Sequence, residues 1–390
     1  MGAGTTVLVL LVAILAGVYQ FYVSPVLNIL GVWRELQPFN PFKNCRQVSE
    51  LKACEEIVLH QPSGLLFLAC STPERRVKWL PAGQAFDTNG LIPSEDYIAV
   101  FDPVSSQVTR LELEGFPDTR GIFVHGIDVV PSESNPNELF VYLVNHRPPR
   151  DGLDAKAVGA DSVIEIFKTN LSGRKLTHVT TVEHPAIIAP NDIIGYPDGK
   201  SFYFTNYFGT KVKAAVVFRE IFNPKSSVVH CHVDQGCKTV ASNMLGSNGI
   251  AQAPNGTIYV ASTAGRELKI FERQEDDSIV LTDVVSTETP LDNLSVDSNG
   301  LVWAAGFPKT LALVHHMEDP VNHAPSCAWK IGINTGPNAF YGEKYKVEKA
   351  YEDDGTLASG TTTIVHDAAR GLVFIHGMHN PILVPAVGLH

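Results

Sequence analysis

Short polar motifs recur along the chain, and each stands directly before a short apolar run. Their members are Glu55 and Glu56, Asn191 and Asp192, Asn248, and Asp292 and Asn293. Carboxylate and amide oxygens, with no clustered thiolates or imidazoles among them, are the ligands that Ca²⁺ prefers, at six to eight per ion. Each motif alone is a weak signal because Asn and Asp abound in turns. The repeated position makes them candidate metal ligands.

The polar motifs open most of six similar units. Each unit continues with an apolar run, a turn rich in Pro, Gly, Asn or Asp, and a strongly β-forming run; the units cover residues 55–71, 125–146, 191–206, 248–262, 291–306 and 361–377. Further strand-like stretches, such as residues 97–102 and 162–167, lie between units. Repeats of this kind predict an all-β fold, a six-bladed β-propeller, with loops inserted on one face because the spacing is uneven.

The register of the polar residues distinguishes a propeller from a β-sandwich. A sandwich of the same composition also contains similar hairpins, but it gives no reason for Glu55, His125, Asn191, Asn248 and Asn293 to occupy matching positions. In a propeller the innermost strand of each blade lines a central channel. Residues at one position of every blade are therefore expected to converge on the axis.

The adjacent polar residues predict two calcium ions. Neighbouring residues of a strand point to opposite faces, so Glu55 and Glu56 are assigned to different centres. The first set is Glu55, Asn191, Asn248, Asp292 and Asn293, and the second is Glu56 and Asp192. Asp292 and Asn293 form the one neighbouring pair assigned to a single ion, which requires a bulge or a strand end at Asp292.

Two histidines are candidates for acid–base chemistry. His125 opens the second unit at the ligand position, and His146 closes the same hairpin. A neutral histidine beside a metal-bound electrophile is a common general base. The chain has no Gly-x-Ser-x-Gly motif and no glycine-rich phosphate loop, which argues against a serine hydrolase of the α/β type and against nucleotide binding.

Composition and the N-terminus indicate where the protein resides. The net charge of −11 and the absence of a basic run argue against a nucleic-acid partner. Residues 7–23 are almost wholly apolar and long enough to span a bilayer, so residues 1–28 are expected to be an uncleaved membrane anchor or signal, and residues 29–390 the propeller. Arg34 and other basic residues after the segment favour a cytoplasmic body. The sequons at Asn170 and Asn255, with the close pair Cys231 and Cys237, outweigh them and favour a secretory-pathway protein with a lumenal or extracellular body.

Taken as an ordered set, these motifs resemble the serum paraoxonase/arylesterase family of calcium-dependent, six-bladed propellers that hydrolyse lactones and aryl esters. The resemblance runs from the neck at residues 33–38 to the C-terminus and is carried by Asn44-Cys45, Glu55-Glu56, His125-Gly126-Ile127, Val144-Asn145-His146, Asn191-Asp192-Ile193, Asn248-Gly249-Ile250 and residues 292–297. It implies a catalytic calcium held by Glu55, Asn191, Asn248, Asp292 and Asn293. It implies a structural calcium held by Glu56, Asp192 and the main-chain carbonyl of Ile127. His125 and His146 match the family's proposed base and its supporting histidine.

The chain departs from the family pattern at several positions. The family has Asp where this chain has Glu56, and it joins the cysteine matching Cys45 to one near the C-terminus, where this chain has none. Tyr207, Phe208 and Phe307 replace polar residues, which predicts a more apolar pocket mouth. These changes bear on substrate preference and organophosphate activity and leave the calcium set intact.

Three functions are compatible with the sequence. The first is a membrane-tethered, calcium-dependent hydrolase of carboxylic esters, aryl esters or lactones. The second is a non-catalytic propeller that uses calcium for stability and binds proteins; the His125 and His146 pair argues against it. The third is a sugar-lactonase type of propeller with a single divalent metal, which the adjacent acidic pairs disfavour.

Overall fold

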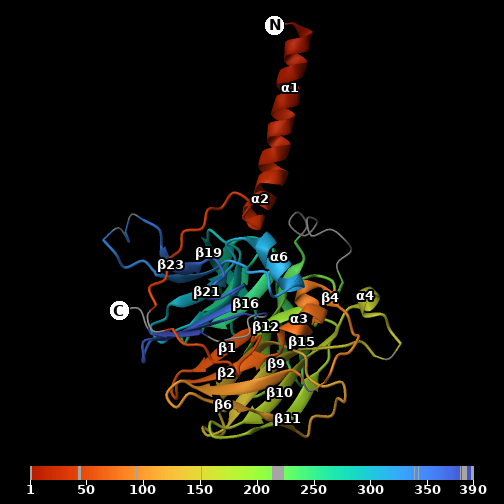
Figure 1. The fold of residues 1–390 in the computed structure, drawn as a ribbon, viewed down its shortest axis with the longest axis vertical. Coiled ribbons are helices and arrows are strands. Elements are labelled where there is room, and N and C mark those ends of the chain that lie inside the picture. The colour runs from red at the N-terminus through yellow and green to blue at the C-terminus, as the bar shows by residue number, and fades with distance from the viewer. Residues whose placement is uncertain are drawn as a thin grey trace.

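The computed structural model describes residues 2–42, 45–93, 95–150, 152–212, 224–337, 339–340, 342–377, 379 and 384–387. A β-propeller forms the body, and a long apolar helix projects from it (Figure 1). The expected all-β propeller preceded by an apolar helix is therefore confirmed. Five of the six predicted units belong to sheets of four or five strands, and the sixth belongs to a sheet of three.

The strands of each sheet follow one another outward from the axis. The first sheet contains β1 (Glu56–His60), β2 (Leu65–Cys70), β5 (Tyr97–Asp102) and β6 (Gln107–Arg110). The second contains β8 (Val124–Pro131), β9 (Leu139–Arg147), β10 (Asp161–Thr169), β11 (Lys175–Val182) and β7 (Glu112–Glu114), which joins β11 in parallel. The third contains β12 (Pro190–Gly195), β13 (Ser201–Asn206), β14 (Ser226–His232) and β15 (Gly236–Met244).

The remaining sheets continue this order. The fourth contains β16 (Ser247–Gln252), β17 (Ile258–Ser262), β18 (Glu267–Arg273) and β19 (Ile279–Ser286). The fifth contains β20 (Leu291–Val296), β21 (Val302–Gly306), β22 (Ser326–Ile333) and β23 (Tyr345–Asp353). The three-stranded sheet contains β24 (Thr363–Asp367), β25 (Leu372–His376) and β26 (Val384–Val387).

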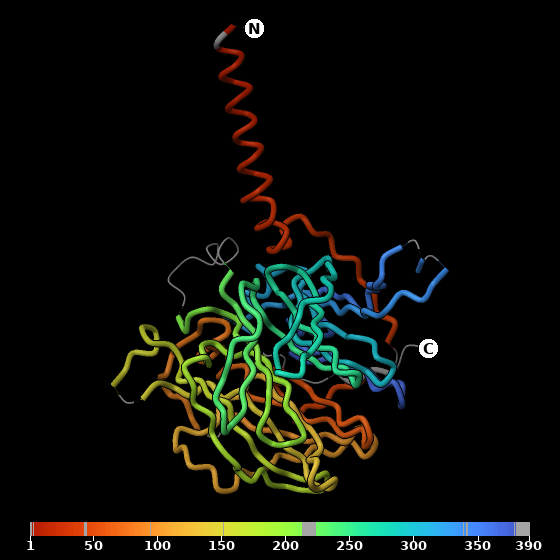
Figure 2. The backbone as a smooth tube through the Cα atoms, turned by 180° about the vertical axis from the view of Figure 1, so that it is seen from behind, coloured from red at the N-terminus to blue at the C-terminus, as the bar shows by residue number. Residues whose placement is uncertain are grey.

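The first strand of each sheet lies on a closed ring. Strand β1 contacts β8, β8 contacts β12, and the contacts continue through β16, β20 and β24 back to β1. The tube view from behind shows the N- and C-terminal parts of the body brought together by this closure (Figure 2). Residues far apart in sequence, such as Glu55 and Thr362, thereby become neighbours: the Thr362 Oγ1 donates to the Glu55 carbonyl oxygen at 2.7 Å.

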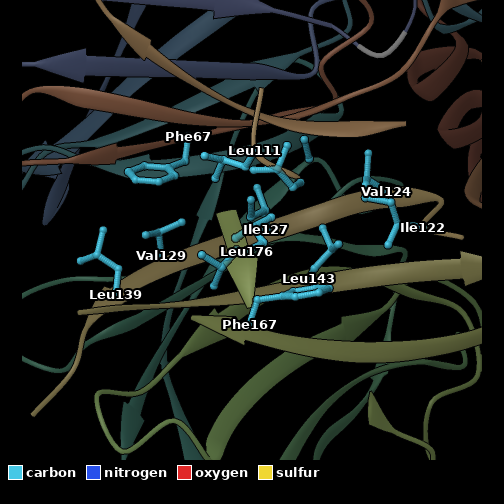
Figure 3. Packing of buried hydrophobic residues seen from close by; sticks show 13 residues of the cluster. Phe67, Leu111, Ile122, Val124, Ile127, Val129, Leu139, Leu143, Phe167 and Leu176 are labelled. Atoms are coloured by element: carbon cyan, nitrogen blue, oxygen red, sulfur yellow. The ribbon is translucent and has the colours of Figure 1, made fainter. Parts of the chain in front are cut away.

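Apolar side chains fill the space between neighbouring sheets. Between the first two sheets, Phe67 packs over Ile127, Leu143 and Phe167, all fully buried (Figure 3). Alternation along each strand supplies these residues to both faces, as a sheet covered on both sides requires. Burial of each large side chain stabilises the fold by roughly 1.5–3 kcal/mol. This packing fixes the angle between sheets and so the position of their inner strands.

The apolar N-terminal segment is one long helical rod. Helix α1 (Ala3–Val18) continues through the π-helical turn η1 (Tyr19–Val23) into α2 (Ser24–Leu30), and Gly31 ends the rod with a positive φ of 67°. The apolar stretch Gly4–Leu30 has 27 residues, is unburied in the fold, and is long enough to cross a bilayer. Its base is tied to the body, because the Thr310 Oγ1 donates to the Ile29 carbonyl at 2.7 Å.

Short helices gather at the end of the propeller where this rod attaches (Figure 1). Helix α6 (Thr310–Glu318) contacts both α2 and α3 (Pro73–Lys78). The segment after α3 forms β3 (Trp79–Leu80), η2 (Pro81–Gly83) and β4 (Ala85–Phe86), and α4 (Ala155–Val158) lies in the loop before β10. The Thr72 side chain caps α3, and Arg75 of α3 forms a buried ion pair with Asp96 at 3.0 Å. Helix α3 is therefore fixed over the first two sheets.

Candidate active site and metal centre

The same irregularity interrupts four of the inner strands at their first residues. The pairing of each with its neighbour slips between Val124 and Ile127 in β8, and at the equivalent points of the other three, 190/193, 247/250 and 291/294. The two residues inside the bulges are His125 and Gly126, Asn191 and Asp192, Asn248 and Gly249, and Asp292 and Asn293, so each bulge holds at least one predicted site residue. The bulge expected at Asp292 is therefore confirmed. A bulge redirects side chains that a regular strand would send apart, so neighbours such as Asp292 and Asn293 can share one centre.

The structure brings the first predicted set together in the interior. Each of its five members is at most 5% exposed. The Asn293 Nδ2 donates to Glu55 Oε1 at 2.8 Å across the closure of the ring, and the Asn248 side chain is hydrogen-bonded to Asp292. The Asn191 Nδ2 lies 3.1 Å from His125 Nε2. These contacts link five inner strands or their leading residues around one point of the channel.

One oxygen of every member of this set lacks a hydrogen-bond donor among the residues that the structure describes. The unpartnered buried oxygens are Glu55 Oε2, Asn191 Oδ1, Asn248 Oδ1, Asp292 Oδ2 and Asn293 Oδ1. Buried polar atoms are nearly always satisfied, since an unpaired one costs about 1–3 kcal/mol. Within the described residues no group of three or more His, Cys, Asp or Glu side chains is arranged to hold a metal. This set has two carboxylates and three amides, a composition suited to a hard oxygen-seeking cation.

The second predicted set forms a separate cluster. Glu56 and Asp192 are hydrogen-bonded to each other, Glu56 Oε2 accepts from the Ile127 N–H at 2.7 Å, and the two Asp192 oxygens accept from the Ile193 and Ile250 N–H groups at 2.6 Å each. The contact to Ile127 uses its N–H, while the resemblance assigned a role to its carbonyl. A cavity of about 240 Å³, lined by Glu56 and Ile127 among others, adjoins this cluster.

Four buried carboxyl groups thus share the channel. Burial raises the pKa of Glu55 to about 7, against the opposing charge of Arg76. Burial also raises the pKa of Asp192 to about 8. Burial, with repulsion from the neighbouring carboxylates, raises the pKa of Glu56 and of Asp292 well above their usual values. Removing four ionised carboxylates from water without cations is strongly unfavourable. The site is therefore suited to dications or, in their absence, to protons.

The two predicted histidines lie side by side above the first set. The His125 and His146 ring centroids are 5.2 Å apart. The Ser162 Oγ bonds His146 Nδ1 at 2.9 Å, and the Trp79 indole N–H donates to the His146 carbonyl at 2.7 Å. His125 Nδ1 and His146 Nε2 have no partner. Burial lowers the pKa of both rings, that of His146 to about 3, so both are neutral at pH 7.

Several residues near the site have no counterpart in the sequence predictions. Arg76 of α3 is buried against the first set, and His376 and His379 are fully buried. Thr205 joins the two sets, because its Oγ1 donates to the Asn248 carbonyl at 2.6 Å and accepts from the Asp192 N–H at 3.1 Å. Arg76 and His379 lie outside the repeated units, and Thr205 and His376 lie at the ends of their units, away from the polar motifs that carried the prediction.

The cysteines divide into two disulfides and two free thiols. Cys231 and Cys237, the close pair in the sequence, form one disulfide. The other joins Cys54 to Cys70, which the sequence did not single out, and Cys54 stands directly before Glu55. Cys45 is free, in agreement with the absent terminal bridge, while its neighbour Asn44 lies outside the described residues. Phe208 and Phe307 are buried, and Phe307 packs with Leu313 under α6.

Comparison with known proteins gives this geometry a context. A family model described as Arylesterase matches residues 37–380. The chain is 25% identical to human serum paraoxonase/lactonase 3 over 333 residues, 84% of this chain and 85% of that protein. It is 25% identical to mouse serum paraoxonase/arylesterase 1 over 358 residues, 90% and 91% of the two chains. A solved luciferin-regenerating enzyme superposes with a TM-score of 0.50 at 13% identity, covering 90% of this chain and 96% of that one, which is a likeness of fold.

Proposed function

Because the chain belongs to the arylesterase family, we propose that it is a calcium-dependent hydrolase of carboxylic esters, aryl esters or lactones. The observation that carries the calcium requirement is the set of five buried oxygens, one from each of five side chains, that have no donor. We count the three-stranded sheet as the sixth blade, because β24 completes the ring of inner strands.

The donor chemistry fits two calcium ions. Glu55, Asn191, Asn248, Asp292 and Asn293 would hold the catalytic ion, and Glu56 and Asp192, with the main chain of Ile127, would hold a structural one. Two ionised carboxylates in each set balance one dication. Calcium in the first set would supply Lewis acidity toward the ester carbonyl and stabilise negative charge on its oxygen.

The protein's own residues orient the reaction. The Asn191 amide group can only donate through Nδ2, so His125 Nε2 accepts and the neutral ring carries its proton on Nδ1. When His146 Nδ1 donates to Ser162, its Nε2 keeps a free lone pair next to His125. His146 Nε2 and His125 Nδ1 then form an acceptor and a donor that take a proton from water and return it to the leaving group.

We further propose a membrane anchor and a secretory location. The rod Gly4–Leu30 would span the bilayer, and its attachment beside α3 and α6 would turn that end of the propeller toward the lipid surface. Both sequon asparagines, Asn170 and Asn255, are exposed in turns and accessible to glycosylation. Both disulfides fit an oxidising compartment.

The test is hydrolysis of a panel of lactones and aryl esters by the detergent-solubilised full chain, with calcium and with excess chelator. Asn248→Ala removes one donor oxygen, so it should lose activity together with calcium affinity. Asn135→Ala, in an exposed turn, is the matched control and should behave as wild type. Full activity in chelator would refute the proposal. Calcium-dependent melting with no turnover on any substrate would instead indicate the binding module.

A further inference from the structure

Arg76 is a buried cation without a salt bridge. Its side chain is 3% exposed, and among the described residues no carboxylate lies within ion-pair distance of it. Asp96, the acid whose charge acts most strongly on Arg76, is occupied by Arg75 at 3.0 Å, by the Ser71 hydroxyl and by the Val124 N–H. A buried charge without a partner is destabilising by several kcal/mol, so a structural role alone does not account for it.

The hydrogen bonds of Arg76 leave most of its donors unused. Nη1 donates to the Val124 carbonyl at 2.6 Å, and Nη2 reaches the Ala53 carbonyl at 3.5 Å. These contacts hold the guanidinium against the residues that precede His125 and Glu55. Nε is buried and has no acceptor. Of five N–H groups, three thus remain without an acceptor in the described part of the chain.

A further unused donor lies nearby. Burial lowers the pKa of His376 to about 4 and that of His379 to about 3, with smaller contributions from the charge of Arg76 and, for His379, from His316, so both rings are neutral at pH 7. Both ring nitrogens of His379 are buried and have no partner among the described residues, whereas the His376 ring accepts from the Gly377 N–H at Nδ1 and is hydrogen-bonded to the Leu51 main chain. A neutral imidazole offers one N–H, so the guanidinium and the His379 ring have donors that no acceptor among the described residues uses.

When calcium occupies both sets, the positive charge around Arg76 is compensated even less. Two dications on the four ionised carboxylates of the two sets sum to zero, which leaves the positive charge of Arg76 beside the site without a compensating charge from either set. Glu55, the acid whose charge acts most directly on Arg76 after Asp96, is then neutralised by its own cation. We propose that Arg76 is the anion-recognition residue of this site and that it binds a carboxylate carried by the substrate or released by hydrolysis.

This inference rests on the proposed hydrolase function and narrows its substrate class. Esters and lactones with a carboxylate on the acyl side place that group against Arg76, with His379 as an additional donor. Arg76 is then a residue that determines specificity and does not act on the reacting bond. A charge-assisted hydrogen bond of this kind favours the anionic partner by about 10- to 100-fold over a neutral isostere.

The experiment compares monophenyl succinate with phenyl methyl succinate, followed by phenol release from the calcium-loaded full chain. The wild type should show a kcat/KM ratio of about 10–100 in favour of the acid. R76Q should bring this ratio close to one, R76K should retain part of it, and K78Q, which removes an exposed cation from the same helix, should leave it unchanged. A wild-type ratio of one, or an unchanged ratio in R76Q, overturns the proposal.

A binding measurement separates this proposal from the hydrolase function. Calorimetric titration with benzoate and with benzamide should show at least about tenfold tighter binding of benzoate in the wild type and equal binding in R76Q. Selective binding of benzoate without phenol release would support the anion site and refute the hydrolase function. Phenol release without selective binding would support the hydrolase function and refute the anion site. If R76Q fails to fold, the wild type and R76K decide. A lowered melting temperature with unchanged selectivity identifies Arg76 as a structural strut and overturns the proposal.

Discussion

The substitution Glu55→Gln tests how much burying a charged ligand destabilises the metal-free protein, and how much the same charge contributes to calcium binding. The substitution keeps the side-chain shape and the oxygen that accepts from Asn293 Nδ2 at 2.8 Å, and it removes the charge. Burial raises the pKa of Glu55 from 4.5 to about 7 in the metal-free protein. A displacement of this size corresponds to about 3 kcal/mol.

The sign follows from proton binding. Between pH 4.5 and about 7 the folded, metal-free protein keeps a proton on Glu55 that the unfolded chain has released. The free energy of unfolding therefore falls as the pH rises through this window, and the full penalty is present above it. Without calcium, Glu55→Gln should be more stable than wild type by about 1–3 kcal/mol at pH 8 and nearly equal to it at pH 5.

With calcium bound, the variant should be less stable than wild type, because it lacks a charged ligand. We expect at least tenfold weaker calcium binding. Denaturant unfolding of the full chain at pH 5 and pH 8, with chelator and with calcium, measures both effects. Glu133→Gln, in an exposed turn, is the control. Equal destabilisation of the metal-free variant at the two pH values, or an unchanged calcium affinity, would refute the reasoning.

Two further substitutions test the surroundings of the donors. His146→Ala should lower kcat by about 10²- to 10⁴-fold with calcium affinity intact, as measured by steady-state kinetics and calcium titration; a parallel loss of both would assign His146 to the metal site. Thr205→Val removes the hydroxyl that bonds Asn248 and Asp192, and should lower the free energy of unfolding by about 1–3 kcal/mol and weaken calcium binding. Thr109→Val on β6 should do neither.

The site residues that belong to the repeated units could be predicted from the sequence. Each inner strand begins with polar residues and continues apolar, so the register alone assigned Asn191, Asn248 and Asn293 to one depth of the channel. The bulges place Asp292, and not Asn293, at the position equivalent to Asn191 and Asn248. The same reasoning required a bulge, which the pairing of β20 confirms. Closure of the ring, which sets Asn293 against Glu55 across more than two hundred residues, follows from the propeller topology.

What the sequence missed comes from outside the repeat. Arg76 lies on α3, a helix that follows the first hairpin, and two adjacent arginines in a short helix ordinarily indicate a solvated face. His379 reaches the interior from the segment after β25. Neither residue recurs at a regular spacing along the chain. Their place near the site is therefore visible only in the folded structure. The Cys54–Cys70 bridge is likewise one of several pairings that spacing alone permits.

Glycines at two of the bulges explain how adjacent blades approach closely enough to share ligands. A Cβ on Gly249 would lie 2.6 Å from Asn293 Cα and from the Asp292 carbonyl oxygen, and a Cβ on Gly126 would meet the backbone of Asn191 and Asp192. Each glycine thus makes room for the second polar residue of the following blade. Two blades with glycine at this place therefore alternate with two that carry Asp192 or Asn293.

This alternation predicts that alanine at each of the two glycines weakens a different calcium site. Gly249→Ala should displace Asn293 and weaken the first calcium site although no donor is removed, because the colliding atoms are backbone and cannot rotate away. Gly126→Ala should displace Asp192 and weaken the second site instead. Calcium titration resolves two binding steps, and each variant should alter a different one. If both variants weaken the same step, or neither weakens any, the two clusters do not form separate centres.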